Sequence, residues 1–471
     1  MSEFNTLLIE MFKRHLEGFE KLVSVTRLTG GASRLTFKVV TICFGEQKII
    51  ALRLNPTDLN TDGLMSHRIS PLAEAKIMKA ARSAGVPAPN ITYILDKKDN
   101  LGEGYLMEWM DGESVGSKIT RAEEFKRIRP TLARQCGTIL ARIHSIAVPS
   151  NGLDHLLETI SPEDFVSRQY ESYQSLEVQR PMIDYVAQWL MDNPPQSRPL
   201  CLVHNDFRNG NFLIDKKQGI TGILDWEIAH IGNPIRDIGW LCTKSWRFGV
   251  PGKMVGGFGM LEDLLSAYKD ASGSEISSKE IKFWTVFGSF WWAVACLLME
   301  KSYENGSDKN LERPIIGRRV SECEVDCAHI LIPGKIDRGV LKIRNSKKRN
   351  NEESLLLSSV RDFIKSEIIK NSEGRTKFLG QIARNSLDIC IREGQFRAEF
   401  NHREKTRLKN LLGCEDQLHQ LRSQLISAIK TRKIPLEDES LKAHLRETAF
   451  SQILIDQPHY PGATDLIKTT F

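Results

Sequence analysis

The stretch that decides the fold runs from Leu202 to Leu241 and reads LVHNDFRNGNFLIDKKQGITGILDWEIAHIGNPIRDIGWL. Asp206 lies in a short His-Asn-Asp turn, Asn211 follows it five residues later, and Asp225 follows the apolar run ITGIL. Phosphoryl transfer to a hydroxyl needs a carboxylate that accepts the hydroxyl proton, and oxygen ligands that hold Mg²⁺ against nucleotide phosphates. We therefore predict Asp206 as the catalytic base, Asn211 and Asp225 as Mg²⁺ ligands, and ATP or GTP as the co-substrate.

The same residues would also suit an ordinary turn between two strands, because Asp and Asn are common in turns. The complete set, with a further aspartate at Asp237, favours kinase-type chemistry over that alternative. We expect His204 to pack under the loop and fix its backbone rather than to act as an acid. Arg208 is expected either to contact the transferred phosphoryl group or to lie at the surface. Asp237 is expected to cap the helix that follows or to support the catalytic loop.

These motifs resemble those of the aminoglycoside phosphotransferase and choline kinase superfamily. They are similar to the branch whose kinase domain is also fused to acyl-CoA dehydrogenases, which reads LVHxDFRxGN, LDWExAHxGxPxxDxGWLC and WRFG, the last found here at Trp246-Arg247-Phe248-Gly249. The similarity covers approximately residues 1–330, and the remainder resembles a helical domain of unknown function. The resemblance implies an α+β, bilobal protein-kinase-like fold, with a small β-rich N-lobe and a large helical C-lobe, followed by a small all-α domain.

A glycine-rich turn and the strand after it form the expected nucleotide clamp. Gly30, Gly31 and Ser33 join two β-patterned runs, and glycines let a backbone approach phosphates closely, although an ordinary hairpin turn would look the same. The next strand carries Arg53 where most kinases have a lysine that pairs with the phosphates. Arginine keeps the positive charge, so we expect activity to be retained. A solvated position on an edge strand is the alternative for Arg53.

Arg53 needs a carboxylate partner, and the helical segment PLAEAKIMKAARSAG offers Glu74. An ion pair between this strand and this helix is an expected kinase feature, and a plain surface position for Glu74 is the alternative. The resemblance further implies that Glu108 to Met110 form the hinge whose backbone meets the adenine. Side-chain identity at the hinge predicts little, because those hydrogen bonds would come from the backbone.

The composition is that of a globular protein, with 471 residues of which 41% are hydrophobic and 26% charged. The N-terminal segment contains Glu3 and Glu10 and predicts an amphipathic helix over 5–22 rather than a signal peptide. Nine scattered cysteines suit a reducing compartment, so a cytoplasmic location is expected. The uncharged segment Phe283–Met299 is short for a bilayer and predicts a buried helix, with a substrate pocket lined by its tryptophans as the alternative.

A basic run separates the kinase-like region from the C-terminal segment. Residues 335–349 hold seven Lys or Arg against one Asp, within a chain of net charge +6. Such a run could contact nucleic acid or anionic lipid, but no aromatic residues are present to stack on bases. We therefore expect a solvated connector, with no nucleic-acid or membrane partner. The expected organisation is N-lobe 1–110, C-lobe 111–332, linker 333–352 and helical domain 353–471.

The C-terminal domain shows helical periodicity without a cluster of titratable groups. Its first helix is expected to place five apolar residues on one face: Leu356, Val360, Phe363, Ile364 and Ile368. We expect this domain to dock a partner or to join copies of the chain as a homo-oligomer.

The acceptor is expected to be a small-molecule hydroxyl. Residues 226–261 carry two carboxylates against four basic side chains: Glu227 and Asp237 against Arg236, Lys244, Arg247 and Lys253. This bias favours an anionic or neutral acceptor over a polycationic aminoglycoside. The resemblance points to a hydroxyacyl-CoA or a related hydroxy acid. An aminoglycoside-type antibiotic kinase and a non-catalytic nucleotide-binding scaffold are the alternatives, and the second conflicts with the presence of all three predicted catalytic and metal residues.

Overall fold

The computed structural model describes residues 3–28, 34–55, 68–337, 339–340 and 352–468. The chain divides into two compact units. The first unit comprises residues 1–162 and 196–281, and the second comprises residues 163–195 and 282–471. This division is coarser than the four expected segments, which stay a prediction, and it places residues 163–195 in the same unit as the C-terminal helices.

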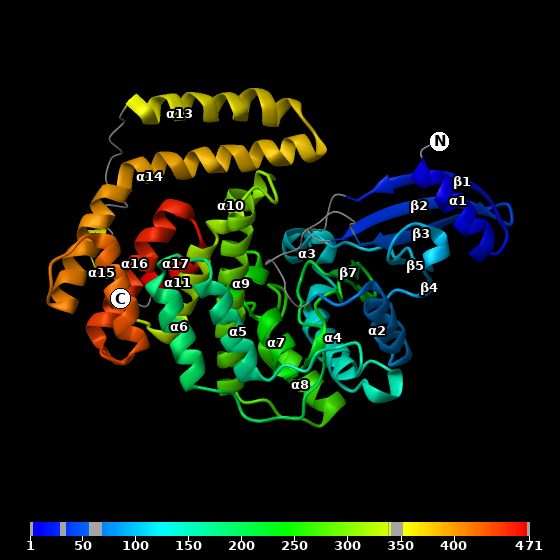
Figure 1. Cartoon of the computed structure of the whole chain (residues 1–471), viewed down its shortest axis with the longest axis horizontal. Coiled ribbons are helices and arrows are strands. Elements are labelled where there is room, and N and C mark those ends of the chain that lie inside the picture. Colours follow the sequence, from blue (N-terminus) through cyan, green and yellow to red (C-terminus); the bar gives the residue numbers. More distant parts are fainter. Residues whose placement is uncertain (1–2, 29–33, 56–67, 338, 341–351, 469–471) are drawn as a thin grey trace. The chain divides into compact units, whose positions relative to one another are not determined.

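The first unit begins with a helix on a five-stranded antiparallel sheet of order β1-β2-β3-β5-β4 (Figure 1). The strands are β1 (Phe19–Arg27), β2 (Leu35–Cys43), β3 (Glu46–Leu54), β4 (Ile91–Ile94) and β5 (Gly104–Glu108). Helix α1 (Glu3–His15) buries Met11 and Phe12 in the same core as Leu52 of β3. The helix expected over 5–22 is therefore too long, because Gly18 adopts a positive φ of 68° and β1 follows at once.

Helix α2 (Pro71–Ser83) carries the expected partner of the β3 arginine. Ser70 caps its N-terminus by accepting a hydrogen bond from the Ala73 N–H at 3.2 Å, and Pro71 occupies its first turn. Glu74 lies on the buried side of the helix and is fully buried. A charged side chain in that position needs a partner, and the site described below supplies two arginines.

The rest of the first unit holds helices and two small two-stranded sheets. These are α3 (Gly116–Arg121), α4 (Arg129–His144), β6 (Cys201–Val203), β7 (Phe212–Asp215), β8 (Gly219–Ile223), β9 (His230–Gly232), α7 (Ile235–Leu241) and α8 (Leu261–Ser272). Strand β6 pairs with β9 and β7 pairs with β8. Helices α4 and α8 approach closely at Gly137, where an added Cβ would lie 2.3 Å from the Leu264 carbonyl oxygen.

The second unit is helical throughout its described residues. Its helices are α5 (Pro162–Gln174), α6 (Pro181–Asp192), most of α9 (Ser278–Glu304), α10 (Glu312–Gly317), α11 (Val320–Leu331), α13 (Glu352–Phe363), α14 (Gly374–Leu412), α15 (Leu418–Lys430), α16 (Glu439–Asp456) and α17 (Pro461–Lys468). The long helix α14 packs against α13, α15 and α16. The chain is therefore α+β, as the sequence predicts, with strands in its N-terminal part and helices in the remainder.

Helix α9 contains the apolar segment that is long enough to cross a membrane by length and composition. Within its most apolar window the mean hydropathy is 1.5, and 83% of that window is buried. This burial matches the predicted core helix of a globular unit.

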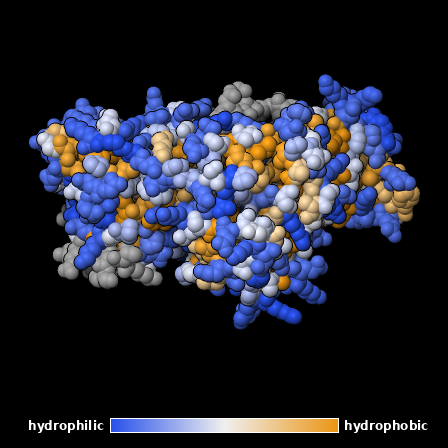
Figure 2. Space-filling model, turned by 90° about the horizontal axis from the view of Figure 1, so that it is seen from below, coloured by the Kyte–Doolittle hydropathy of each residue, from blue (hydrophilic) through white to orange (hydrophobic). Residues whose placement is uncertain are grey.

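Hydrophilic side chains cover most of the face shown in Figure 2, with hydrophobic side chains in patches between them.

Helix α13 lies along α14 (Figure 1). Of the five apolar residues expected on one face, Leu356, Val360 and Phe363 are 70%, 49% and 55% exposed, whereas Ile364 and Ile368 are half-buried. A π-helical turn over Ile364–Ile369 follows α13, so a period of 3.6 residues holds only as far as Phe363. The common face of the five residues stays a prediction.

Candidate active site

The loop between β6 and β7 presents Asp206 with both carboxylate oxygens held by side chains. Oδ1 accepts hydrogen bonds from Trp240 Nε1 at 2.8 Å and from Arg208 Nε at 2.9 Å. Oδ2 accepts a hydrogen bond from Asn211 Nδ2 at 2.6 Å. Three donors fix the rotamer of this carboxylate. Oδ1 already accepts two hydrogen bonds, whereas Oδ2 accepts one and keeps acceptor capacity for a further donor such as a hydroxyl.

Asp237 at the start of α7 supports the backbone of the same loop. Its two oxygens accept the backbone N–H groups of His204 at 2.8 Å and Asn205 at 2.7 Å, and His144 Nε2 lies 3.2 Å from Oδ2. Burial raises the pKa of Asp237, but His144 and the backbone donors outweigh burial and lower it from its ordinary value. A buried carboxylate that stays ionised thus joins α4, α7 and the loop.

His204 connects the Asp206 loop to the loop that follows β8. Its Nδ1 accepts the Asp206 N–H at 3.2 Å, so Nε2 carries the proton and donates to the Leu224 carbonyl at 3.1 Å. Burial lowers the pKa of His204 from its usual value, which agrees with a neutral ring. Because Leu224 directly precedes Asp225, this histidine fixes the spacing between the two predicted reactive aspartates.

Asn205 occupies a left-handed backbone conformation in the same loop. Its φ is +66°, a left-handed value that asparagine tolerates better than most residues. Its side chain donates to the Ile228 carbonyl at 3.2 Å and accepts from Arg236 Nε at 3.0 Å. The loop therefore keeps the required turn and gains two side-chain anchors.

Asn211 and Asp225 offer the oxygen atoms expected of Mg²⁺ ligands. Asn211 Nδ2 also donates to the Asp206 carbonyl at 3.0 Å, so its amide nitrogen is committed and Oδ1 is left as an acceptor. Asp225 has a positive φ of 70°, and the nearby Arg53 outweighs burial to lower its pKa. The described residues hold no cluster of three His, Cys, Asp or Glu suited to a metal. One carboxylate and one amide oxygen nonetheless fit Mg²⁺, which takes few protein ligands when substrate phosphates complete its shell.

Arg53 on β3 joins three carboxylates. Its NH1 lies 3.4 Å from Glu74 Oε1, and its NH2 lies 2.5 Å from Asp225 Oδ1 and 3.1 Å from Glu227 Oε2. Burial lowers the pKa of Arg53, but these carboxylates outweigh burial and raise it well above the ordinary value. The structure thus brings together the predicted strand–helix pair and the predicted metal aspartate.

Arg34 and Glu227 belong to this network and were missed by the sequence reasoning. Arg34 donates to Glu74 Oε2 and to the Ile69 carbonyl, and its Nε lies 3.7 Å from Glu227 Oε2. Glu227 is 6% exposed and follows Asp225 by two residues. The acidic pair in the Asp-Trp-Glu motif was the signal for Glu227, whereas nothing local in the sequence distinguishes Arg34.

The remaining expected nucleotide contacts are only partly described. Glu108 ends β5, its Oε1 accepts from Arg82 NH1 at 2.7 Å and from the Asn90 N–H at 2.8 Å, and so its side chain is committed to the protein. No hydrogen bond to Met110 occurs within the described part of the chain, which leaves its backbone N–H as a candidate hinge donor. The expected phosphate-binding residues that lie outside the described residues are Gly30, Gly31 and Ser33.

Cationic and aromatic side chains surround the predicted base. The Arg208 guanidinium lies 4.3 Å from the centroid of the Trp246 ring, and that of Arg236 lies 4.8 Å from the Trp240 ring. Burial lowers the pKa of Arg236 to about 10, so it remains a cation at neutral pH. Trp240 and Arg236 were not predicted as site residues, although both lie in the stretch that decides the fold.

The comparisons with known proteins decide the family. A model described as the phosphotransferase enzyme family matches residues 24–269, which is more than half of the chain. The chain belongs to this family. A domain of unknown function, DUF6285, matches residues 370–460 of the same phosphotransferase.

Curated relatives and a solved structure agree with that assignment. The phosphotransferase is 30% identical over 180 residues to acyl-CoA dehydrogenase family member 10 of Mus musculus, covering 37% of the chain and 16% of the relative. It is 28% identical over 276 residues to family member 11 of Rattus norvegicus, covering 54% of the chain and 34% of the relative. The chain thus spans about a third or less of these relatives' length. A Ralstonia eutropha structure described as a candidate aminoglycoside phosphotransferase superposes with a TM-score of 0.54 at 21% identity, covering 68% of this chain and 95% of that one.

The predicted kinase-like fold and the superfamily resemblance are therefore confirmed. The family model shows the family, and the solved structure shows the fold.

Proposed function

We propose that this phosphotransferase transfers the γ-phosphoryl group of ATP or GTP to the hydroxyl of a small anionic molecule, of the hydroxyacyl-CoA or hydroxy-acid class. The observation that carries the proposal is the environment of Asp206, an oriented carboxylate beside two arginines stacked on tryptophans. The carboxylate suits a hydroxyl nucleophile, and the cations suit an anionic acceptor.

Asp206 acts as the base in this reaction. The acceptor hydroxyl oxygen attacks the γ-phosphorus while its proton moves to a carboxylate oxygen of Asp206, and the bond from the γ-phosphorus to the β-phosphate oxygen breaks. Trp240, Arg208 and Asn211 hold the carboxylate toward the acceptor. His204 and Asp237 are positioning residues, because they act through the loop backbone.

The nucleotide side of the site rests on the network around Arg53. Arg53 would pair with the nucleotide phosphates, and Glu74 would orient its guanidinium. When bound with the nucleotide, Mg²⁺ offsets the charge that develops on the phosphates, and Asn211 and Asp225 would hold it. The backbone of Glu108 to Met110 would form hydrogen bonds with the purine ring of the nucleotide.

Two observations support the anionic acceptor over a polycation. Arg208 contacts the base directly and is partly exposed, so a polycationic aminoglycoside would meet a like charge there, and Arg236, fully buried behind Trp240, adds positive potential from below the surface. The matched relatives are named acyl-CoA dehydrogenase family members, which supports an acceptor of the acyl-CoA type. Phosphorylation of such a hydroxyl would turn it into a good leaving group for a later elimination.

The test is nucleotide consumption by the purified chain with a panel of hydroxyacyl-CoAs, free hydroxy acids and aminoglycosides. We expect ATP or GTP consumption with at least one anionic acceptor, and a phosphorylated product in mass spectra. Asp206→Asn should abolish this signal, whereas Asp270→Asn, at a 64% exposed position, should not. If only aminoglycosides stimulated nucleotide consumption, the proposed acceptor class would be contradicted. It would also be contradicted if no member of the panel stimulated it.

A further inference from the structure

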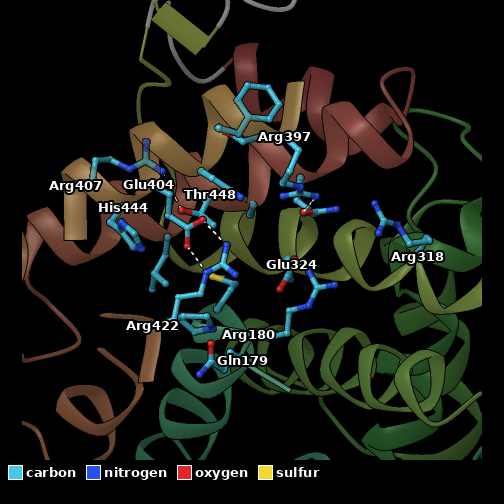
Figure 3. A pocket seen from close by; sticks show the side chains of 18 residues that line it. Gln179, Arg180, Arg318, Glu324, Arg397, Glu404, Arg407, Arg422, His444 and Thr448 are labelled. Carbon is cyan, nitrogen blue, oxygen red and sulfur yellow. Dashed lines mark hydrogen bonds and ion pairs between the residues drawn. The ribbon is translucent and has the colours of Figure 1, made fainter. Parts of the chain in front are cut away.

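The second unit contains a cavity of about 290 Å³ that none of the residues assigned above to the reaction lines. Its lining comes from α6, α11, α14, α15 and α16 and from the segments before α6 and after α10 (Figure 3). A large part of this lining belongs to the DUF6285 domain. The volume lies near the lower end of the range for pockets that hold small molecules.

Positive charge predominates in the lining. The charged residues are Arg180, Arg318, Arg397, Arg407 and Arg422, with Glu324 and Glu404. Figure 3 shows arginines from different elements extending toward the same space. Arg422 holds both oxygens of Glu404, with Nε 2.8 Å from Oε1 and NH2 2.6 Å from Oε2. Among the side chains of the lining itself there are three more positive than negative charges, and Glu393, Glu447 and Asp456 outside the lining pair with Arg397, Arg407 and Arg318.

Carboxylates outside the lining, together with Thr448 and Gln452 of the lining itself, hold Arg407 and Arg397 in place, and Asp456 outside the lining pairs with Arg318. Arg407 NH1 lies 3.0 Å from Glu447 Oε2, and its NH2 donates to Thr448 at 3.0 Å. Arg397 NH2 lies 3.0 Å from Glu393 Oε2 and donates a hydrogen bond to Gln452 Oε1 at 2.9 Å. Carboxylates behind the lining thus fix the guanidinium groups without occupying the cavity. Such pre-organisation lowers the cost of binding an anion.

His444 supplies the observation that points to an occupant. It is 2% exposed, and neither ring nitrogen has a hydrogen-bond partner among the described residues. Burial, together with Arg407 and Arg422, lowers the pKa of His444 to about 3, so the ring is neutral with one donor and one acceptor. Asn401 Oδ1 and Arg407 Nε are also buried without a partner. Buried polar groups are normally satisfied, so several unsatisfied groups around one cavity indicate a missing polar partner.

We propose that this cavity binds a small organic anion, whose phosphoryl or carboxylate group contacts the arginines and whose polar body hydrogen-bonds to His444. Planar guanidinium groups match both kinds of anion with paired N–H donors. Glu324 does not strongly oppose the binding of an anion. Arg180 NH1 lies 3.4 Å from Glu324 Oε2, and burial raises the pKa of the Glu324 carboxyl group. The site gives a binding chemistry to the domain of unknown function, independently of the phosphoryl acceptor.

The test is NMR of the full chain labelled at histidine, titrated with inorganic phosphate and, separately, with malonate. The histidine signal that disappears in His444→Phe is assigned to His444. It reports on the cavity itself and not on anions that enter the nucleotide site. We expect saturable movement of this signal with one of the two anions, which identifies the phosphoryl or the carboxylate class. Sodium chloride at equal ionic strength should not move it.

Arginine variants give the matched control. Arg180→Gln removes a lining charge and should weaken the affinity about tenfold or more. Arg375→Gln removes a 45% exposed arginine of the same unit, outside the lining, and should leave the affinity unchanged. A His444 signal that neither anion moves would overturn the proposal. So would equal affinities in wild type and Arg180→Gln.

Discussion

At the scale of single residues, Asp206 is the proposed base. Asp206→Asn keeps the shape and can still bond to its neighbours but cannot accept the hydroxyl proton, so turnover should fall by about a thousandfold. Nucleotide binding should be retained, because Asp206 is not among the nucleotide contacts. Steady-state kinetics together with nucleotide titration checks both statements. Retention of a tenth of the wild-type turnover would mean that another group is the base.

His444 predicts a pH dependence of stability. Its pKa is about 3 in the folded chain and near its usual value of about 6.5 when unfolded, so the unfolded state binds more protons between these values. The free energy of unfolding should therefore decrease as the pH falls from about 6.5 to about 3. His444 alone should account for up to about 1.4 kcal/mol of this loss per pH unit. Urea unfolding of wild type and His444→Phe at about pH 7 and pH 5 measures the loss of unfolding free energy between these pH values. Equal losses in both proteins would show that His444 contributes nothing.

The sequence indicates residue contacts best where they are local. Asp206 and Asn211 lie five residues apart and are hydrogen-bonded, whereas the roles of Asp206, Asn211 and Asp225 stay predictions. The contact between His144 and Asp237 joins positions 93 residues apart, and no local pattern specifies that distance. Arg34 was missed for the same reason, since its partner Glu74 is 40 residues away.

At the scale of elements, β3 and α2 are joined through Arg53 and Glu74. Arg53→Lys keeps the charge, but a single ammonium cannot offer separate nitrogens to Glu74 and to Asp225. We expect kcat/KM for the nucleotide to fall about tenfold or more. Arg134→Lys on the exposed side of α4 serves as the control, and unchanged kinetics in Arg53→Lys would refute a bridging role.

Helix packing offers a prediction with a matched pair of glycines. Gly137→Ala would place a Cβ 2.3 Å from the Leu264 carbonyl oxygen, so α4 and α8 must separate, at a cost of about 1–3 kcal/mol. Gly394 in α14 has open space around an added Cβ, and Gly394→Ala should stabilise by about 0.5–1 kcal/mol. Thermal unfolding of both variants checks the signs. Equal effects would show that the close approach of α4 and α8 does not constrain the sequence.

Element boundaries were harder to predict than element types. The strand containing Arg53 and the helix containing Glu74 follow from periodicity. The first helix ends at His15 because a glycine turn and a strand follow, although apolar residues continue beyond that point. The π-helical turn after α13 occurs without any local sign such as proline or glycine.

At the scale of the whole molecule, we propose different chemistry for the two units. The first unit holds the predicted base and Mg²⁺ ligands, which lie close together in the sequence. The second unit holds the arginine-lined cavity, whose lining comes from several helices distant in sequence, so composition and motifs gave no sign of it. Tertiary packing alone brings those side chains together.

The most direct test of the central claim is nucleotide binding with and without Mg²⁺, measured for wild type and Asp225→Ala, with Asp270→Ala as the control. The account predicts Mg²⁺-dependent ATP or GTP binding in wild type and in the control, and its loss in Asp225→Ala. Binding that is independent of Mg²⁺, or that persists in Asp225→Ala, would contradict the assignment of this site as the phosphotransferase centre.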